Sequence, residues 1–226
     1  MGRRHTRFLE ACVTSLEEAL EAQAGGAQRV ELCENLEVGG VTPSVELIRT
    51  VKDALKIPVN VLVRPRGGSF TFSEEEVEEM LGSIATCKEI GVNAIVIGAL
   101  DASGNVDIPV MQRLIGAARP LSVTFHRAFD VCAAPLKAFE DIISLGCDRL
   151  LTSGHEASAY DGRRLIGQLV EKSAGRIVVM AGCGVKPYNI VEIERASGAP
   201  EYHSSSHGPD GKTSRQVVSQ LADNSL

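Results

Sequence analysis

The chain has 226 residues, 44% of them hydrophobic and 23% charged, which is the balance of an ordinary globular protein with one sizeable core. A net charge of -6 argues against a nucleic-acid-binding face, because phosphate neutralisation needs clustered lysine and arginine. No apolar run reaches the roughly 20 residues of a membrane span, so we expect neither nucleic acid nor a membrane as partner.

The chain begins with a short basic segment, MGRRHTR, which no apolar segment follows. We therefore expect residues 1–7 to form a flexible basic tail and residues 8–226 to form one domain. Six cysteines are scattered without CxxC pairs or the density of a secreted disulfide scaffold. Free thiols in a reducing cytoplasm are the better expectation.

Eight short runs rich in apolar and β-branched residues recur along the chain, each bounded by turn residues. We expect strands at 8–13, 29–33, 59–64, 94–98, 121–126, 149–152, 176–181 and 200–203. The segments between them carry helical patterns, and SLEE at 15–18 and SEEE at 73–76 fit the capping box. Four prolines suit first helical turns: Pro43, Pro109, Pro135 and Pro187. Five glycines suit helix ends: Gly25, Gly91, Gly146, Gly175 and Gly198.

Alternation of strand and helix indicates βαβ units with a parallel sheet, and eight units predict a closed (β/α)8 TIM barrel of the α/β class. The alternative is a doubly wound open sheet, which usually has a Gly-rich phosphate loop directly after its first strand. Here that place holds VTSLEE. The eighth unit gives the weakest signal, so its helix is the one expected to be incomplete.

Two strands repeat the same pair of chemical groups. Glu10 and Cys12 lie two residues apart in FLEACV, and Glu31 and Cys33 do so in RVELC. Because side chains alternate along a strand, each pair shares one face. If both glutamates face the barrel interior, both thiols do too.

Chemistry in TIM barrels sits at the C-terminal ends of the strands and in the loops that follow. The candidates for acid-base and charge-bearing roles at these ends are Glu10, Glu31, Arg64, His126, Asp130, Glu201 and His203. The structural alternative is an internal ion-pair network, in which carboxylates on strands 1, 2 and 8 balance Arg64, Arg66 and Arg127.

TSG after the sixth strand and MAGCG after the seventh form a glycine-lined segment in which backbone N–H groups could hold an anion. The candidate anion-binding residues are Arg64, Ser153, Gly154, Gly182 and Gly184. The alternative is that the glycines only permit tight turns between strand and helix.

Several motifs together resemble the CutC copper-homeostasis family, in its vertebrate form. They are FLEACV, RVELCEN, GGVTPS, VLVRPRGGSFTFSEEE, TFHRAFD, RLLTSG, RIVVMAGCGV and the final EYH. The resemblance covers roughly residues 8 to 203 and implies a TIM barrel, a cytoplasmic location that in animals includes the nucleus, a homo-oligomer such as a dimer or tetramer, and a role in copper handling. Cys12 and Cys33 match the cysteines implicated in Cu(I) binding.

The chain also departs from the family pattern. The family usually has three glycines where this chain reads Gly182, Cys183 and Gly184, which adds a thiol at the barrel mouth. The segment after the eighth strand is short and different, which puts contacts from the final helix in doubt.

Two functions remain open at this stage. The first is a copper-binding protein in which Cys12 and Cys33, on neighbouring parallel strands, converge on one Cu(I) ion, a soft ion that accepts few ligands, whereas Zn(II) normally takes four. Cys183 is a weaker third candidate, and two buried thiols without a ligand are the structural alternative. The second function is an enzyme that acts on a small phosphate- or carboxylate-bearing substrate.

Overall fold

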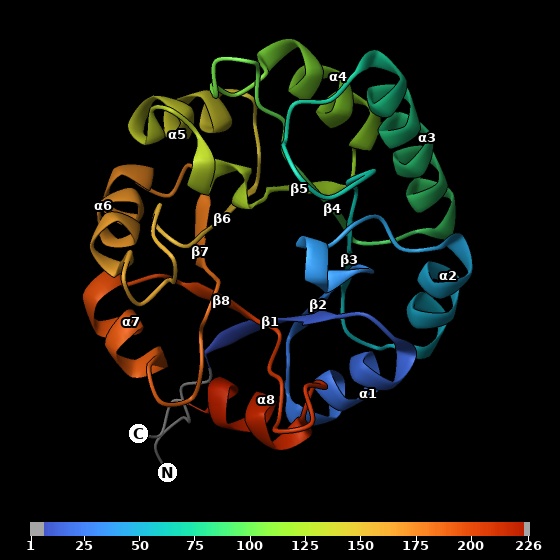
Figure 1. The fold of residues 1–226 in the computed structure, drawn as a ribbon. Helices are drawn as coiled ribbons and strands as arrows, with labels where there is room; N and C mark the ends of the chain where they lie inside the picture. Colours follow the sequence, from blue (N-terminus) through green and yellow to red (C-terminus); the bar gives the residue numbers. More distant parts are fainter. Residues whose placement is uncertain (1–6, 224–226) are drawn as a thin grey trace.

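The computed structural model describes residues 7–223, and its eight parallel strands close into a barrel (Figure 1). Each strand pairs with the next along the chain, and β8 pairs with β1. The strands are β1 (Phe8–Val13), β2 (Arg29–Leu32), β3 (Val59–Leu62), β4 (Ala94–Ile97), β5 (Ser122–Phe125), β6 (Arg149–Thr152), β7 (Val178–Ala181) and β8 (Glu201–Ser204). The predicted TIM barrel is confirmed, and the closed order excludes the open sheet.

Helices form a ring outside the barrel (Figure 1). They are α1 (Leu16–Gly25), α2 (Val45–Ala54), α3 (Glu74–Ile90), α4 (Ile108–Ala118), α5 (Pro135–Ser144), α6 (Arg163–Ser173), α7 (Ile190–Ser197) and α8 (Arg215–Ala222), with short 3-10 helices η1 (Leu36–Val38) and η2 (Arg127–Val131). Outward-facing strand residues such as Leu9, Ala11 and Val13 are fully buried in the main apolar core. None of the helices within residues 7–223 is long and apolar enough to cross a membrane.

The helix-start signals hold in part. Pro109 and Pro135 lie in first turns, whereas Pro43 and Pro187 precede the residues that cap α2 and α7. At α3 the capping box is complete, because Ser73 accepts a hydrogen bond from the Glu76 amide while the Glu76 side chain accepts one from the Ser73 amide. At α1, Ser15 caps the helix, but the Glu18 carboxylate accepts hydrogen bonds from Thr14 instead of from the Ser15 amide. The reason lies in the last unit, where the Thr213 amide donates to the other oxygen of Glu18.

The eighth helix, which the sequence predicted to be the incomplete one, is present over eight residues. Val218 and Leu221 are fully buried, and Gly25 allows the close approach of α8 to α1, since a Cβ there would lie 2.6 Å from Val218 Cβ. Arg7, the last residue assigned to the basic tail, is buried and forms an ion pair of 2.8 Å with Glu194. Arg7 therefore belongs to the folded domain, and residues 1–6, the rest of the expected tail, lie outside the described part of the chain.

A buried network of ion pairs lies in the barrel interior around Glu10 on β1. Arg29 forms ion pairs with Glu10 and Glu201, and the Asn60 amide donates to Glu10 at 2.9 Å. Arg149 also reaches Glu201, at 3.0 Å. These partners differ from those expected from the sequence, because Arg29 and Arg149 sit on the strands themselves and point inward beside the carboxylates.

The expected arginines have other partners in the loops above the strands. Arg66 forms an ion pair with Glu76, and Arg127 forms one with Asp130. Arg64 donates to backbone carbonyls. The buried network thus stabilises the barrel interior, whereas Arg64, Arg66 and Arg127 lie at the mouth of the barrel.

Replacing Arg29 by methionine should destabilise the protein by about 3–5 kcal/mol, because it leaves the buried Glu10 carboxylate without its counter-ion and leaves Glu201 with Arg149 alone. Urea denaturation of Arg29→Met and wild type measures the difference. Arg113→Met is the matched control, since Arg113 pairs with Glu74 and Glu78 at the exposed surface, and its effect should stay below about 1 kcal/mol. Equal stability of both variants would contradict the role given to Arg29.

Candidate functional site

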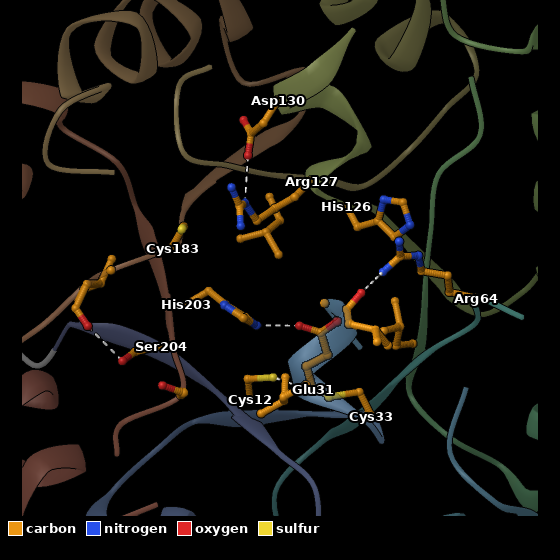
Figure 2. A pocket seen from close by; sticks show the side chains of 18 of the residues that line it. Cys12, Glu31, Cys33, Arg64, His126, Arg127, Asp130, Cys183, His203 and Ser204 are labelled. Atoms are coloured by element: carbon orange, nitrogen blue, oxygen red, sulfur yellow. Dashed lines mark hydrogen bonds and ion pairs between the residues drawn. The ribbon is translucent and has the colours of Figure 1, made fainter. Parts of the chain in front are cut away.

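A cavity of about 550 Å³ opens at the C-terminal ends of the strands (Figure 2). The hydroxyl-bearing residues Ser204 and Ser205 line it, together with three other kinds of polar groups. Thiols come from Cys12, Cys33 and Cys183, imidazoles from His126 and His203, and charged groups from Glu31, Arg64, Arg127, Asp130 and Lys186. Leu36, Val38 and Phe70 close it on one side with apolar surface. The cavity lies where the chemistry of TIM barrels is found.

The two predicted thiols meet inside the barrel. Cys12 Sγ and Cys33 Sγ are 3.6 Å apart, both residues are buried, and neither forms a disulfide. Cys12 pairs in register with Glu31, so Cys33 lies one interior position further along β2. The hydrogen bond to the Cys33 thiol, together with burial, raises the pKa of the Cys12 thiol well above its ordinary value. Without a bound cation, Cys12 is a neutral thiol and a poor nucleophile.

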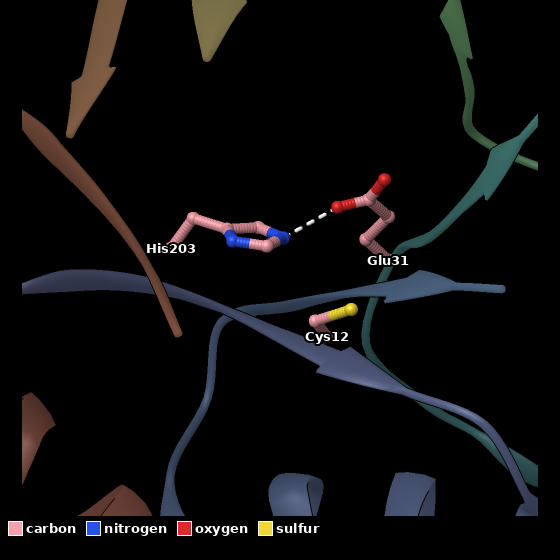
Figure 3. Close-up of side chains that lie close together, drawn as sticks. All are labelled: Cys12, Glu31 and His203. Carbon is pink, nitrogen blue, oxygen red and sulfur yellow. Dashed lines mark hydrogen bonds and ion pairs between the residues drawn. The ribbon is translucent and has the colours of Figure 1, made fainter. Parts of the chain in front are cut away.

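His203 on β8 reaches across β1 to Glu31 on β2. Its Nε2 and a carboxylate oxygen of Glu31 form a short contact (Figure 3). Glu10 Oε1 lies 4.0 Å from the same nitrogen. Burial opposes protonation of this imidazole, but the charge and hydrogen bond of Glu31 outweigh it and raise the pKa of His203. The donor atoms of Cys12, Glu31 and His203 all lie within 4.8 Å of one another.

Arg64 stands on the other side of the cavity and holds the loops around it. Its guanidinium donates to the carbonyls of Val38, Gly40 and Gly68 and lies 4.6 Å from the centre of the Phe70 ring. Its Nε is buried without a hydrogen-bond partner among residues 7–223. Arg64 therefore fixes the cavity wall.

His126 is buried beside Phe70, with ring centres 5.0 Å apart. Its Nδ1 accepts from the Ala128 amide at 3.2 Å, which caps η2 and leaves the proton of the neutral ring on Nε2. Burial and the nearby charge of Arg64 lower the pKa of His126 to about 4. At neutral pH this histidine is uncharged.

Asp130 does not pair with His126. Its carboxylate accepts from the Thr152 hydroxyl at 2.5 Å, from the Ser153 amide at 3.0 Å, and from Arg127 at 2.9 Å. It joins η2 to the end of β6. Glu201 likewise lies in the ion-pair network below the cavity, so the site candidates from the sequence separate into an upper and a lower group.

Of the five candidate anion-binding residues, Arg64 and Gly184 line the cavity. The other three lie in the turns that follow β6 and β7. Their backbone amides donate hydrogen bonds within the protein: Ser153 to Asp130, Gly154 to the Thr152 hydroxyl, and Gly182 to the Thr152 carbonyl. Anion binding at this place stays a prediction.

Cys183 lines the same cavity but stands apart from the other two thiols (Figure 2). Its backbone has a φ of 74°, a left-handed conformation that suits glycine, and its thiol lies 3.3 Å from the Ala157 carbonyl. The added thiol thus contacts the neighbouring loop between β6 and α6.

Sequence reasoning missed two features of the site. The bond between Glu31 and His203 was not foreseen, although both residues were candidates on strands that flank β1, which is the signal that could have paired them. Lys186, in the turn before α7, also escaped notice, because no spacing links it to the other cavity residues.

All eight strands of the barrel fall within the match to one protein family. The model of the CutC family matches residues 7–208. The family protein CutC of Parabacteroides distasonis is 52% identical over 200 residues, 88% of this chain and 82% of that protein, and the one of Xylella fastidiosa is 51% identical over 197 residues, 87% and 74%. A crystal structure of CutC from Streptococcus agalactiae, described as a candidate copper homeostasis protein, is 32% identical with a TM-score of 0.84 over 88% of this chain and 98% of that one.

The lowered pKa of His126 makes stability depend on pH. Between pH 6.5 and about 4 the unfolded chain binds a proton that the folded state rejects, so stability falls as pH falls through this window. At pH 5 wild type should have lost about 2 kcal/mol through this group relative to pH 7.5. Urea unfolding of wild type and His126→Gln at both pH values isolates that loss, and parallel pH dependence of the two proteins would refute it.

Proposed function

The chain belongs to the CutC family of copper homeostasis, and on that premise we propose that it binds Cu(I) through the thiolates of Cys12 and Cys33. The observation that carries the proposal is the pair of buried, unoxidised sulfur atoms 3.6 Å apart. Cu(I) is soft and is satisfied by two thiolates, so one ion between the two sulfurs meets its needs.

The donor chemistry fits this cargo. Thiolates are the ligands that select Cu(I), and a bound cation offsets the cost of deprotonating thiols that burial keeps neutral. The position favours retention, because both sulfurs lie at the floor of the cavity and not at its rim. The ion would be cargo that enters and leaves through the mouth.

The family resemblance also supports proposals about the location of the protein in the cell and about its assembly. We propose a cytoplasmic protein that also enters the nucleus and assembles as a dimer or tetramer. Size-exclusion chromatography with light scattering tests the assembly, and localisation of a tagged chain tests the compartment.

A second candidate function is an enzyme acting on a small phosphate- or carboxylate-bearing substrate. The observation in its favour is the cavity volume of about 550 Å³, which is far more than one ion fills and is typical of small-molecule sites. Arg127, Lys186 and Arg64 give this space positive charge, and the Glu31–His203 pair could transfer a proton.

Cu(I) titration against a competing chelator, under anaerobic reducing conditions, tests the first function. Wild type should bind one ion per chain, and Cys12→Ser and Cys33→Ser should each weaken binding by at least roughly 100-fold, since each removes half of the ligand set. Cys183→Ser is the matched control, a thiol of the same cavity that should be dispensable. Wild-type stoichiometry and affinity in both folded serine variants would refute the proposal.

Titration with inorganic phosphate tests the second function. Lys186→Ala and Arg64→Ala should each weaken binding by roughly tenfold, or about 1.4 kcal/mol, because each removes a positive charge from the cavity. The Lys186 ammonium forms no hydrogen bond or ion pair within residues 7–223, so its removal leaves the fold intact. Arg113→Ala, at the outer surface, is the control. Identical binding by all four proteins would count against an anion site.

A further inference from the structure

Four potential metal-binding groups converge where β8, β1 and β2 lie side by side. Cys12 comes from β1, Glu31 and Cys33 come from β2 and the residue after it, and His203 comes from β8 (Figure 2). The closed strand order places β1 between the other two strands, so the side chains of β2 and β8 meet above it. The set contains two sulfurs, one carboxylate and one imidazole.

We infer that these four groups form one tetrahedral site for a divalent cation of the Zn(II) type, and that Glu31 and His203 are ligands that Cu(I) does not need. The inference rests on the proposed function in one respect, that Cys12 and Cys33 serve as metal ligands. It adds a second metal class to the same place and assigns two residues to it. Zn(II) binds with four such nitrogen, oxygen and sulfur ligands in structural sites.

The distances suit a tetrahedral ion. With Zn–S bonds of about 2.3 Å, two sulfurs lie about 3.8 Å apart, and nitrogen and oxygen ligands lie about 3.3 Å apart. Here the sulfurs are 3.6 Å apart, and the donor atoms of Cys12, Glu31 and His203 lie within 4.8 Å of one another. The donor atoms of Cys12, Glu31 and His203 already form one cluster, and Cys33 Sγ adjoins it through Cys12 Sγ. An ion bound there would replace the contact between His203 Nε2 and Glu31.

The charge balance also favours a cation. Two thiolates and one carboxylate would supply three negative charges against the two positive charges of a divalent ion, and His203 would bind as a neutral imidazole. Glu10 Oε1 stands 4.0 Å from His203 Nε2, is buried, and has no hydrogen-bond partner in the part of the chain that the structure describes. A carboxylate oxygen left in that position lowers the energy of a positive ion nearby.

The ligand count decides which metal each residue serves. Sequence alone identified two thiols as ligands, which favoured Cu(I) over an ion that requires four ligands. The structure adds a carboxylate and an imidazole to the same point, so this preference no longer follows from ligand number. Glu31 and His203 become the residues that hold a harder divalent ion, while the two sulfurs suffice for the soft one.

Co(II) is the probe that distinguishes these roles, because its visible bands report tetrahedral coordination and its near-ultraviolet charge-transfer bands report thiolate ligands. Anaerobic titration of wild type should give both signals at one ion per chain, and one equivalent of Zn(II) should abolish them. Glu31→Gln and His203→Gln should weaken Co(II) and Zn(II) binding by at least roughly tenfold, the loss that even indirect partners of a metal site cause. Both variants should keep the Cu(I) affinity of wild type.

Matched controls come from the same mouth. Glu34→Gln replaces a carboxylate that bonds Ser44, and His155→Gln replaces an imidazole beside Cys132; neither residue lines the cavity, so both variants should bind Co(II) as wild type does. Unchanged Co(II) affinity and spectra in both Glu31→Gln and His203→Gln would overturn the four-ligand site and leave Cu(I) binding standing. Co(II) binding without Cu(I) binding would support the four-ligand site and refute the proposed function. Failure of wild type to bind either ion would overturn both.

Discussion

The alternation of side chains in β1 and β2, fixed by the pairing of Cys12 with Glu31, determines what the barrel interior contains. A slip of one residue would turn Glu10 and Cys12 towards the helices and bring Leu9 and Ala11 inside. That slip is strongly unfavourable, because Leu9 and Ala11 are fully buried against the helix layer. Packing of the apolar face thus holds the two thiols at one point.

The polar face would be costly without its own counter-charges. Arg29 lies between Glu10 and Glu201 and neutralises the layer below the thiols, while His203 is held against Glu31 in the layer that contains them. The carboxylates of the lower layer are balanced by arginines, which stay protonated. The carboxylate of Glu31 in the upper layer is balanced by a histidine, which can give up its proton. This difference makes the lower layer structural and the upper layer open to exchange with a metal ion.

Most of the fold followed from local patterns. All eight strands were located within two residues at each end, because apolar runs between turn residues are a local signal. Alternation placed Cys12 and Cys33 on the same faces as Glu10 and Glu31, and the structure shows that these faces are interior. The partners of the arginines did not follow. Arg64 reaches carbonyls in three loop positions, and Asp130 reaches Thr152 and Ser153, contacts that depend on loop paths no periodicity encodes. The convergence of His203 on Glu31 depends on barrel closure, which brings residues 172 positions apart together.

X-ray absorption at the copper edge of Cu(I)-loaded protein tests the central claim most directly, because it reports the atoms bound to the metal. The account predicts a first coordination shell of two sulfur atoms in wild type, reduced to one in Cys12→Ser and in Cys33→Ser, and unchanged in Cys183→Ser. A shell made only of nitrogen and oxygen neighbours, or a sulfur shell that both single variants retain, would contradict it.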